Sequence, residues 1–197
     1  MIRSKTATTI LALGAGAAVL ATAMGAFTAR AESYRDRSVD MAVEGALDLE
    51  RYAGTWYEIA RFPNEFEENC AGVTAEYALM PEGGVGVTNT CRKGTLDGPV
   101  EQAEGEARVA APGRLEVRFA PEWLSFLPMV WGDYWVLAVS ENYTVAVVGS
   151  PDGETGWVLA REPQIPEAEY EAALGVLRQN GYDISAIERV PQFDSAL

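Results

Sequence analysis

Between Thr55 and Arg161, hydrophobic and polar residues alternate with a period of two in short runs, which is typical of β-strands. Eight runs are expected to form strands, at 55–62, 73–80, 85–92, 100–109, 114–119, 133–140, 143–149 and 156–161. Most connections between them are short and rich in Gly, Pro, Asn or Asp. Because short connections join antiparallel neighbours, the pattern predicts an all-β fold, an eight-stranded up-and-down antiparallel β-barrel that can enclose one small ligand.

After Arg161 the spacing of the apolar residues changes to that of a helix. Pro166 can occupy the first turn of this helix, and Asn180-Gly181 suits its C-terminal end. Its apolar residues form a single stripe, made of Ala173, Leu174 and Leu177. We therefore expect one C-terminal α-helix that packs on the outside of the barrel.

The alternation also assigns side chains to the inside of the barrel. Tyr77, Asn89 and Phe119 fall on the inward faces of their strands. One face of the strand 100–109 carries only small residues, namely Ala103, Gly105, Ala107 and Val109. Small inward side chains leave space, so an interior cavity is expected, with filling by large side chains from other strands as the alternative.

The connection 120–132 is too apolar for an ordinary solvated loop, and it contains Trp123, Phe126 and Trp131. Two interpretations remain open. The loop either packs as a cover over one end of the barrel, or it forms an apolar rim that contacts a membrane surface through its aromatic residues.

The first 31 residues differ from the rest of the chain. Arg3 and Lys5 precede an apolar run from Thr8 to Phe27, and Ala-Arg-Ala at 29–31 supplies the small residues that signal peptidase requires. This predicts a cleaved secretory signal peptide, with an uncleaved membrane anchor as the alternative. No cysteine directly follows the run, so we expect a free periplasmic or secreted protein and not a lipoprotein.

Composition excludes several kinds of chemistry. The chain has no histidine and two cysteines, Cys70 and Cys91, which cannot complete a tetrahedral metal site, so we expect no metal and no other cofactor. Residues 1–31 hold three of the 15 basic residues and none of the 29 acidic ones, so the rest of the chain has 12 basic and 29 acidic residues and a net charge of −17. Such a surface repels phosphate backbones, so nucleic acid is not an expected partner.

In an exported domain, two cysteines favour a disulfide. Straight pairing across the turn at 81–84, however, places Cys91 opposite Thr74 and not opposite Cys70. The thiols would then lie too far apart to bond. Either the chain bends or bulges near Ala71-Gly72, or the disulfide is absent.

Three segments carry a resemblance to a known family. Residues 50–61 read ERYAGTWYEIAR and resemble the Gly-x-Trp motif at the first strand of lipocalins, most closely its WYEIAR form in the group of bacterial outer-membrane lipocalins and apolipoprotein D. GDYWVL at 132–137 and WVLAREP at 157–163 follow in the order and spacing of that family. The resemblance implies that Gly54, Trp56 and Arg161 are structural residues, with Trp56 plugging the closed end and Arg161 stacked on its indole.

The resemblance also implies a set of ligand-binding residues that face the barrel interior: Glu58, Tyr77, Asn89, Phe119, Tyr134 and Trp157. A mostly aromatic set with a few polar groups suits a fatty acid, a lysophospholipid or a similar lipid. Glu58 is the unusual member, because an inward carboxylate must be paired, solvated or protonated. The implied function is binding and transport or storage of such a ligand in the cell envelope.

Two other functions compete with ligand binding. A barrel enzyme acting on a lipid or isoprenoid is disfavoured by the lack of histidine and of serine-nucleophile motifs, although Glu58 can supply acid/base chemistry. A protein-interaction module would use the loop 120–132, and pairing into a homodimer is left open.

The expected organisation of the chain follows from these patterns. Residues 1–31 are the signal peptide, residues 32–46 a polar, flexible leader without sustained periodicity, residues 47–192 the lipocalin domain, and residues 193–197 a tail.

Overall fold

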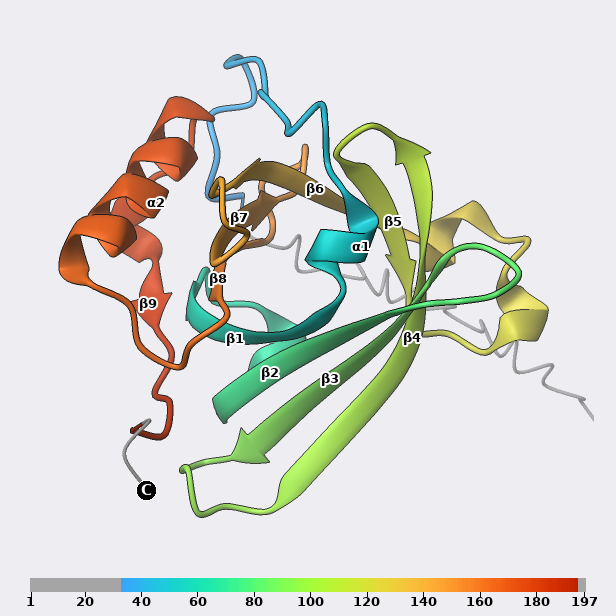
Figure 1. Cartoon of the computed structure of the whole chain (residues 1–197), viewed down its shortest axis with the longest axis horizontal. Helices are drawn as coiled ribbons and strands as arrows, with labels where there is room; N and C mark the ends of the chain where they lie inside the picture. The colour runs from blue at the N-terminus through green and yellow to red at the C-terminus, as the bar shows by residue number, and fades with distance from the viewer. Residues whose placement is uncertain (1–32, 195–197) are drawn as a thin grey trace, which may run out of the picture. The chain divides into compact units, whose positions relative to one another are not determined.

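The computed structural model describes residues 33–194 (Figure 1). The expected signal peptide at 1–31 and the last residues of the tail, 195–197, lie outside the described residues. The described part contains the domain and most of the expected leader.

The strands form a closed barrel. Their bounds are β1 (Gly54–Arg61), β2 (Cys70–Leu79), β3 (Val85–Lys93), β4 (Val100–Ala111), β5 (Arg114–Arg118), β6 (Gly132–Val139), β7 (Val145–Gly149) and β8 (Gly156–Ala160). Each pairs antiparallel with the next, and β1 pairs with both β8 and β2, which closes the sheet. A short extra strand, β9 (Glu188–Arg189), pairs with the end of β1. The prediction of an eight-stranded up-and-down barrel is confirmed.

One predicted strand starts later than expected, for a local reason. The run 143–149 becomes β7 only from Val145, because Tyr143 has a φ of 59°. This left-handed conformation belongs to a turn and does not continue a strand.

The predicted helix is α2 (Glu167–Gln179), which lies on the outside of the barrel beside β7 (Figure 1). Its buried stripe, Tyr170, Ala173, Leu174 and Leu177, packs in one cluster with Ile59, Leu137 and Val147 from the outer face of the barrel. The expected packing is thus confirmed. Within residues 33–194, no helix has the length and apolar character needed to cross a membrane.

A second helix, α1 (Leu49–Tyr52), precedes β1. It is a single turn, which begins because the Asp48 side chain accepts hydrogen bonds from the backbone N–H groups of Glu50 and Arg51. A segment this short shows no sequence period. It places Tyr52, which is buried, in the cluster of side chains that packs inside the barrel.

A β-bulge in β1 determines which of its side chains face inward. Glu58 lies opposite Leu159 of β8, but the register then shifts, so that Arg61 lies opposite Trp157. Residues that are paired across neighbouring strands point to the same face. Glu58 and Arg61, three positions apart, therefore both face the interior, where regular alternation would separate them.

A second irregularity, in β2, brings the cysteines together. The β2–β3 register shifts between Ala71 and Thr74, and Gly72 there has a φ of 56°, a conformation that favours glycine. Cys70 and Cys91 form a disulfide, with their Cα atoms 5.4 Å apart. The predicted bend near 71–72 is confirmed, and so is the disulfide.

Residues 33–46, part of the expected flexible leader, make specific contacts with the domain. The backbone N–H of Tyr34 donates to Gly153 O at 2.8 Å, and that of Glu44 donates to Val136 O at 2.9 Å. The buried Arg35 side chain donates through Nε to Asn180 O at 2.7 Å. Ordered contacts with the barrel therefore begin ahead of residue 47.

Candidate functional site

The closed end of the barrel is built around Trp56. Its side chain is fully buried, and its Nε1 donates to Tyr52 O at 2.8 Å. The Arg161 guanidinium carbon lies 3.9 Å from the centre of the indole ring, and its Nη1 donates to Thr55 O at 2.7 Å. Its Nη2 donates to the carbonyls of residues 51, 52 and 53. Gly54, with a φ of 96°, allows the tight turn from α1 into β1. These contacts fix the end of the barrel structurally.

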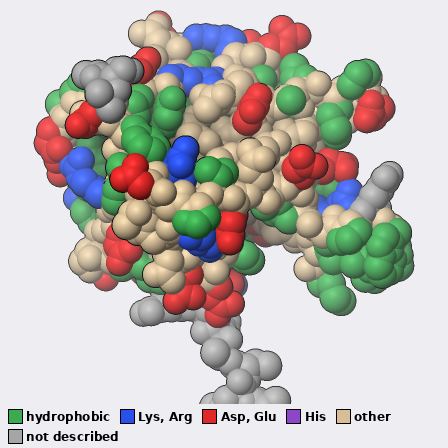
Figure 2. Space-filling model, turned by 90° about the horizontal axis from the view of Figure 1, so that it is seen from below, with side chains coloured by type: hydrophobic (Ala, Val, Ile, Leu, Met, Phe, Trp, Pro, Cys, Tyr) green, Lys and Arg blue, Asp and Glu red, His purple; other side chains and the backbone are tan. Residues whose placement is uncertain are grey.

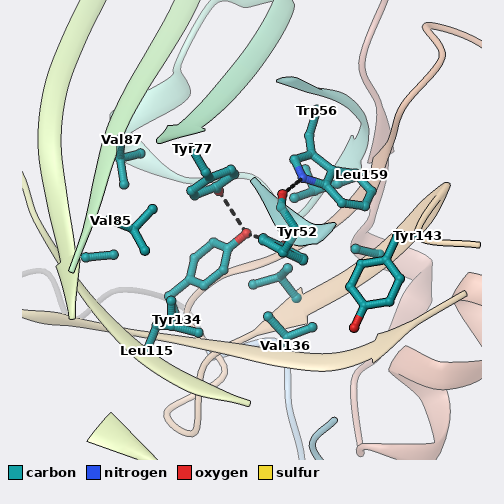
Figure 3. Packing of buried hydrophobic residues seen from close by; sticks show 13 residues of the cluster. Tyr52, Trp56, Tyr77, Val85, Val87, Leu115, Tyr134, Val136, Tyr143 and Leu159 are labelled. Atoms are coloured by element: carbon teal, nitrogen blue, oxygen red, sulfur yellow. Dashed lines mark hydrogen bonds between the residues drawn. The ribbon is translucent and has the colours of Figure 1, made fainter. Parts of the chain in front are cut away.

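Three buried tyrosines meet above this end (Figure 3). Tyr77 Oη donates to Tyr134 Oη at 2.8 Å, and Tyr52 Oη shares a second hydrogen bond with Tyr134 Oη, also at 2.8 Å. Burial raises the pKa of all three phenols, so they remain neutral. Three hydroxyl protons make only two hydrogen bonds, so one proton has no acceptor among the described residues.

A buried ion pair lies on the inner face of β1. Arg61 Nη1 donates to Glu58 Oε1 at 2.8 Å, and the Glu58 side chain is only 4% exposed. Arg61 Nη2 also donates to the backbone carbonyls of Glu67 and Cys70, both at 3.0 Å. Arg61 thereby joins the β1 wall to the connection 62–69, which carries Glu67.

Glu67 reaches from this connection toward the barrel interior. Its Oε2 accepts a hydrogen bond from Trp157 Nε1 at 3.0 Å and another from Asn64 Nδ2 at 2.6 Å. The indole of Trp157 stacks on Tyr134, with ring centres 6.4 Å apart, and Tyr134 lies 6.0 Å from the ring of Tyr77. The carboxyls and the tyrosines therefore form one continuous site.

The electrostatics of Glu58 are dominated by its burial. Desolvation, then the charge of Glu67 and a hydrogen bond with its side chain, raise the pKa of Glu58 well above its ordinary value near 4.5, and the contact with Arg61 lowers it only in part. Glu58 therefore takes up a proton more readily than a glutamate in water.

We expect the Glu58→Gln variant to gain stability relative to the original protein as the pH rises from about 4 to about 8. Because the pKa of Glu58 is raised in the folded state, its contribution to stability is fully present below its ordinary pKa and is lost as the pH rises through the raised pKa. A glutamine side chain does not ionise, so the variant does not lose this stability as the pH rises. Urea unfolding across the pH range measures the effect, and Glu65→Gln, at an exposed neighbouring glutamate, is the control. If the unfolding free energy of Glu58→Gln and of the original protein changed equally with pH, the raised pKa of Glu58 would be contradicted.

The remaining two predicted ligand residues lie apart from this group. Asn89 is opposite Ala75 and Ala103 on the inner face, and its Oδ1 is buried with no hydrogen-bond partner among the described residues. Phe119 is 46% exposed and its ring lies against Gly105, where an added Cβ would be 2.7 Å from the phenyl Cδ1. Although β5 ends at Arg118, Gly105 lies opposite Val87 on the inner face of β4, so the Phe119 ring lies on the expected inward side and is partly exposed there.

The face of small residues on β4 has a mixed environment. Ala107 is fully buried and packs in the same cluster as Tyr77 and Tyr134, so large side chains from other strands fill the space there. Ala103 is exposed, because β5 pairs only with the second half of β4. Val109 lies opposite the buried Leu115, which keeps it on the expected inner face, and it is exposed near the end of β4, where the register shifts.

The connection between β5 and β6 projects as a group of hydrophobic side chains at one side of the molecule (Figure 2). Trp123, Phe126 and Met129 are 72%, 75% and 84% exposed. Trp131 is half-buried, and the guanidinium carbons of Arg108 and Arg118 lie 4.1 and 5.2 Å from the centre of its ring. The interpretation of this loop as a packed cover is therefore wrong for Trp123 and Phe126, whereas Trp131 attaches the loop to the barrel.

Comparison with known proteins places this geometry in a family. The family model described as "Lipocalin-like domain" matches residues 47–192. The chain is 36% identical over 162 residues to temperature-induced lipocalin-1 of Arabidopsis thaliana, covering 79% of this chain and 85% of the relative. It is also 36% identical over 177 residues to the outer membrane lipoprotein Blc of Escherichia coli, covering 88% and 96%.

Solved structures agree with the fold. Insecticyanin from the tobacco hornworm Manduca sexta superposes with a TM-score of 0.61 at 23% identity, over 83% of this chain and 88% of insecticyanin. The sequence relatives and the family-model match over 47–192 show membership of a family in addition to a shared fold. The chain belongs to the lipocalin family.

Proposed function

We propose that this lipocalin binds one small amphiphile, such as a lysophospholipid or a fatty acid, in its barrel and carries or stores it in the cell envelope. The observation that carries the proposal is the convergence of polar groups inside an apolar barrel, where Trp157 stacks on Tyr134 of the tyrosine group and donates to the Glu67 carboxyl. Pockets that are apolar with a few placed polar groups are typical of lipid ligands.

Tryptophan fluorescence tests this proposal directly, because Trp157 belongs to the site. Titration with a lysophospholipid is expected to change the fluorescence until one ligand is bound per chain. The Trp157→Phe variant should lose most of the signal, whereas Trp123→Phe, which alters an exposed tryptophan, should keep it. Shortening the acyl chain by two methylenes should weaken binding about tenfold, at about 0.8 kcal/mol for each methylene.

Two results together would contradict ligand binding. A titration without saturation by either a lysophospholipid or a fatty acid, together with an unliganded mass in native mass spectrometry, would contradict ligand binding. We favour binding over catalysis because Glu58, the carboxyl considered for acid/base chemistry, is engaged with Arg61.

We also propose that the exposed loop docks on a membrane surface from which the ligand is taken. Trp123, Phe126 and Met129 project together, and tryptophan favours the interface between water and lipid. By the up-and-down order of strands, this loop lies at the same end of the barrel as the connection 62–69, which carries Glu67 and the 83% exposed Phe66. Docking there would bring a lipid to the site.

Vesicle binding tests the docking step. We expect the protein to co-sediment with phosphatidylcholine vesicles, and the Trp123→Ser/Phe126→Ser variant to lose at least about tenfold in partitioning. Leu79→Ser, which removes an exposed apolar side chain beside the turn at the other end of the barrel, is the matched control. Equal partitioning of all three proteins would contradict membrane docking, and loss of a dimer in the double variant by ultracentrifugation would assign the loop to a second copy of the chain instead.

Action outside the cytoplasm is part of the proposal. It is supported by the export-type pattern of residues 1–31 and by the disulfide that engages Cys70 and Cys91, the two cysteines of the chain. The intact mass of the protein from its own host tests whether residues 1–31 are removed.

A further inference from the structure

We propose that Glu58, Glu67 and the aromatic rings around them form a site for a positively charged head group, an ammonium, and that this site disfavours a free carboxylate or phosphate. The inference rests on the proposed binding of an amphiphile and narrows its class. It predicts that an amphiphile with an ammonium end is preferred over a fatty acid of the same chain length.

The balance of charges in the site is the first argument. The site holds two carboxyls, those of Glu58 and Glu67, and one guanidinium, that of Arg61. This guanidinium already donates to the Glu58 carboxyl and to the carbonyls of residues 67 and 70. Among the described residues of the site no second cation is present to receive an anion, so an entering carboxylate would meet two carboxyls. Like charges brought together in a buried site repel strongly.

The electrostatics of the two carboxyls are the second argument. Burial and the charge of Glu67 both raise the pKa of Glu58, although its Oε1 accepts from Arg61 at 2.8 Å. A cation bound beside these carboxyls favours the charged form of Glu58. Binding of such a ligand therefore releases a proton, whereas binding of a neutral ligand does not.

The aromatic rings are the third argument. Trp157 donates its N–H to Glu67, stacks on Tyr134, and completes a row of rings with Tyr77. The faces of such rings attract cations, and ammonium ligands are often held by several rings together. Glu67 and Trp157 are half-buried whereas Glu58 is buried, so the site is reached from the side of Glu67.

Four amphiphiles that share a dodecyl chain test the inference: dodecyltrimethylammonium, dodecanol, dodecanoate and dodecyl sulfate. Below their micelle concentrations, the ammonium compound is expected to bind at least about tenfold more tightly than dodecanoate, with dodecanol between them. Calorimetry in two buffers of different ionisation enthalpy should show proton release for the ammonium compound and none for dodecanol.

Glu67→Gln is the decisive variant, because glutamine keeps an oxygen that can accept from Trp157 but removes the charge. It should abolish the preference for the ammonium over dodecanoate and the proton release, and should change the affinity for dodecanol much less than the affinity for the ammonium compound. Glu65→Gln, an exposed glutamate in the same connection, should change none of these.

Three outcomes are distinguishable. Equal or tighter binding of dodecanoate than of the ammonium compound would overturn the head-group inference, while ligand binding itself would stand. An unchanged preference in Glu67→Gln would also overturn it. Failure of all four amphiphiles, dodecanol included, would overturn both this inference and the proposed function.

Discussion

Replacing Trp56 with alanine is expected to lower the free energy of unfolding by about 3 to 5 kcal/mol. The indole is fully buried, so its removal leaves a cavity at the closed end of the barrel. It also leaves Tyr52 O without the Nε1 donor and removes the ring on which Arg161 stacks at 3.9 Å. Because Tyr52 contributes its hydroxyl to the tyrosine group, the loss should also weaken ligand binding.

Urea unfolding followed by circular dichroism measures this loss. Trp123→Ala removes an equally large side chain that is 72% exposed, and should change stability by no more than about 0.5 kcal/mol. Similar values for the two variants would show that Trp56 does not hold the closed end together. Trp56→Phe, which keeps most of the ring but loses the N–H donor, should fall between them.

The strands were predictable because alternation over five or more residues leaves a strong pattern, as in β5, where Leu115 and Val117 alternate with charged residues. The irregularity in β2 was predictable as one of two alternatives, since without it the cysteines could not meet and the disulfide would be absent. The bulge in β1 could not be predicted, because nothing in the amino-acid sequence at 58–60 indicates that one residue has no partner on the neighbouring strand. Arg61 was therefore missed as an inward residue, although it is central to the site.

Tyr52 and Glu67 were missed for a different reason. Tyr52 enters the barrel from a single helical turn, and Glu67 from a connection, and neither segment has a period that fixes its orientation. Their positions depend on tertiary contacts, such as the Trp157 N–H that Glu67 accepts. Of the residues proposed from the sequence, the four that meet in the site are Glu58, Tyr77, Tyr134 and Trp157.

The loop 120–132 shows what composition alone leaves open. Its apolar content correctly marked it as unusual, but a cover over the barrel and an exposed rim have the same composition. Two arginines decide the outcome, because Arg108 and Arg118 hold Trp131 against the barrel wall while Trp123 and Phe126 project outward. This cation–π contact joins positions far apart in the sequence.

The second large effect is expected at Arg61. Replacing Arg61 with leucine should cost about 3 to 5 kcal/mol of unfolding free energy at about pH 8, because it leaves the Glu58 carboxylate buried without its partner. The cost should be smaller at about pH 4.5, since Glu58, whose pKa is raised, is then protonated and carries no charge to compensate. Urea unfolding at both pH values measures the difference.

A double variant and a surface control separate the ion pair from other roles of Arg61. If the buried charge is the main cost, Glu58→Gln/Arg61→Leu should be more stable at high pH than Arg61→Leu alone. Arg189→Leu breaks an exposed pair with Glu167 and should cost less than about 1 kcal/mol at either pH. The loss of stability in Arg61→Leu could instead be independent of pH and unrelieved by Glu58→Gln. The role of Arg61 would then lie in its hydrogen bonds with the carbonyls of residues 67 and 70, which hold the connection 62–69 to the barrel wall.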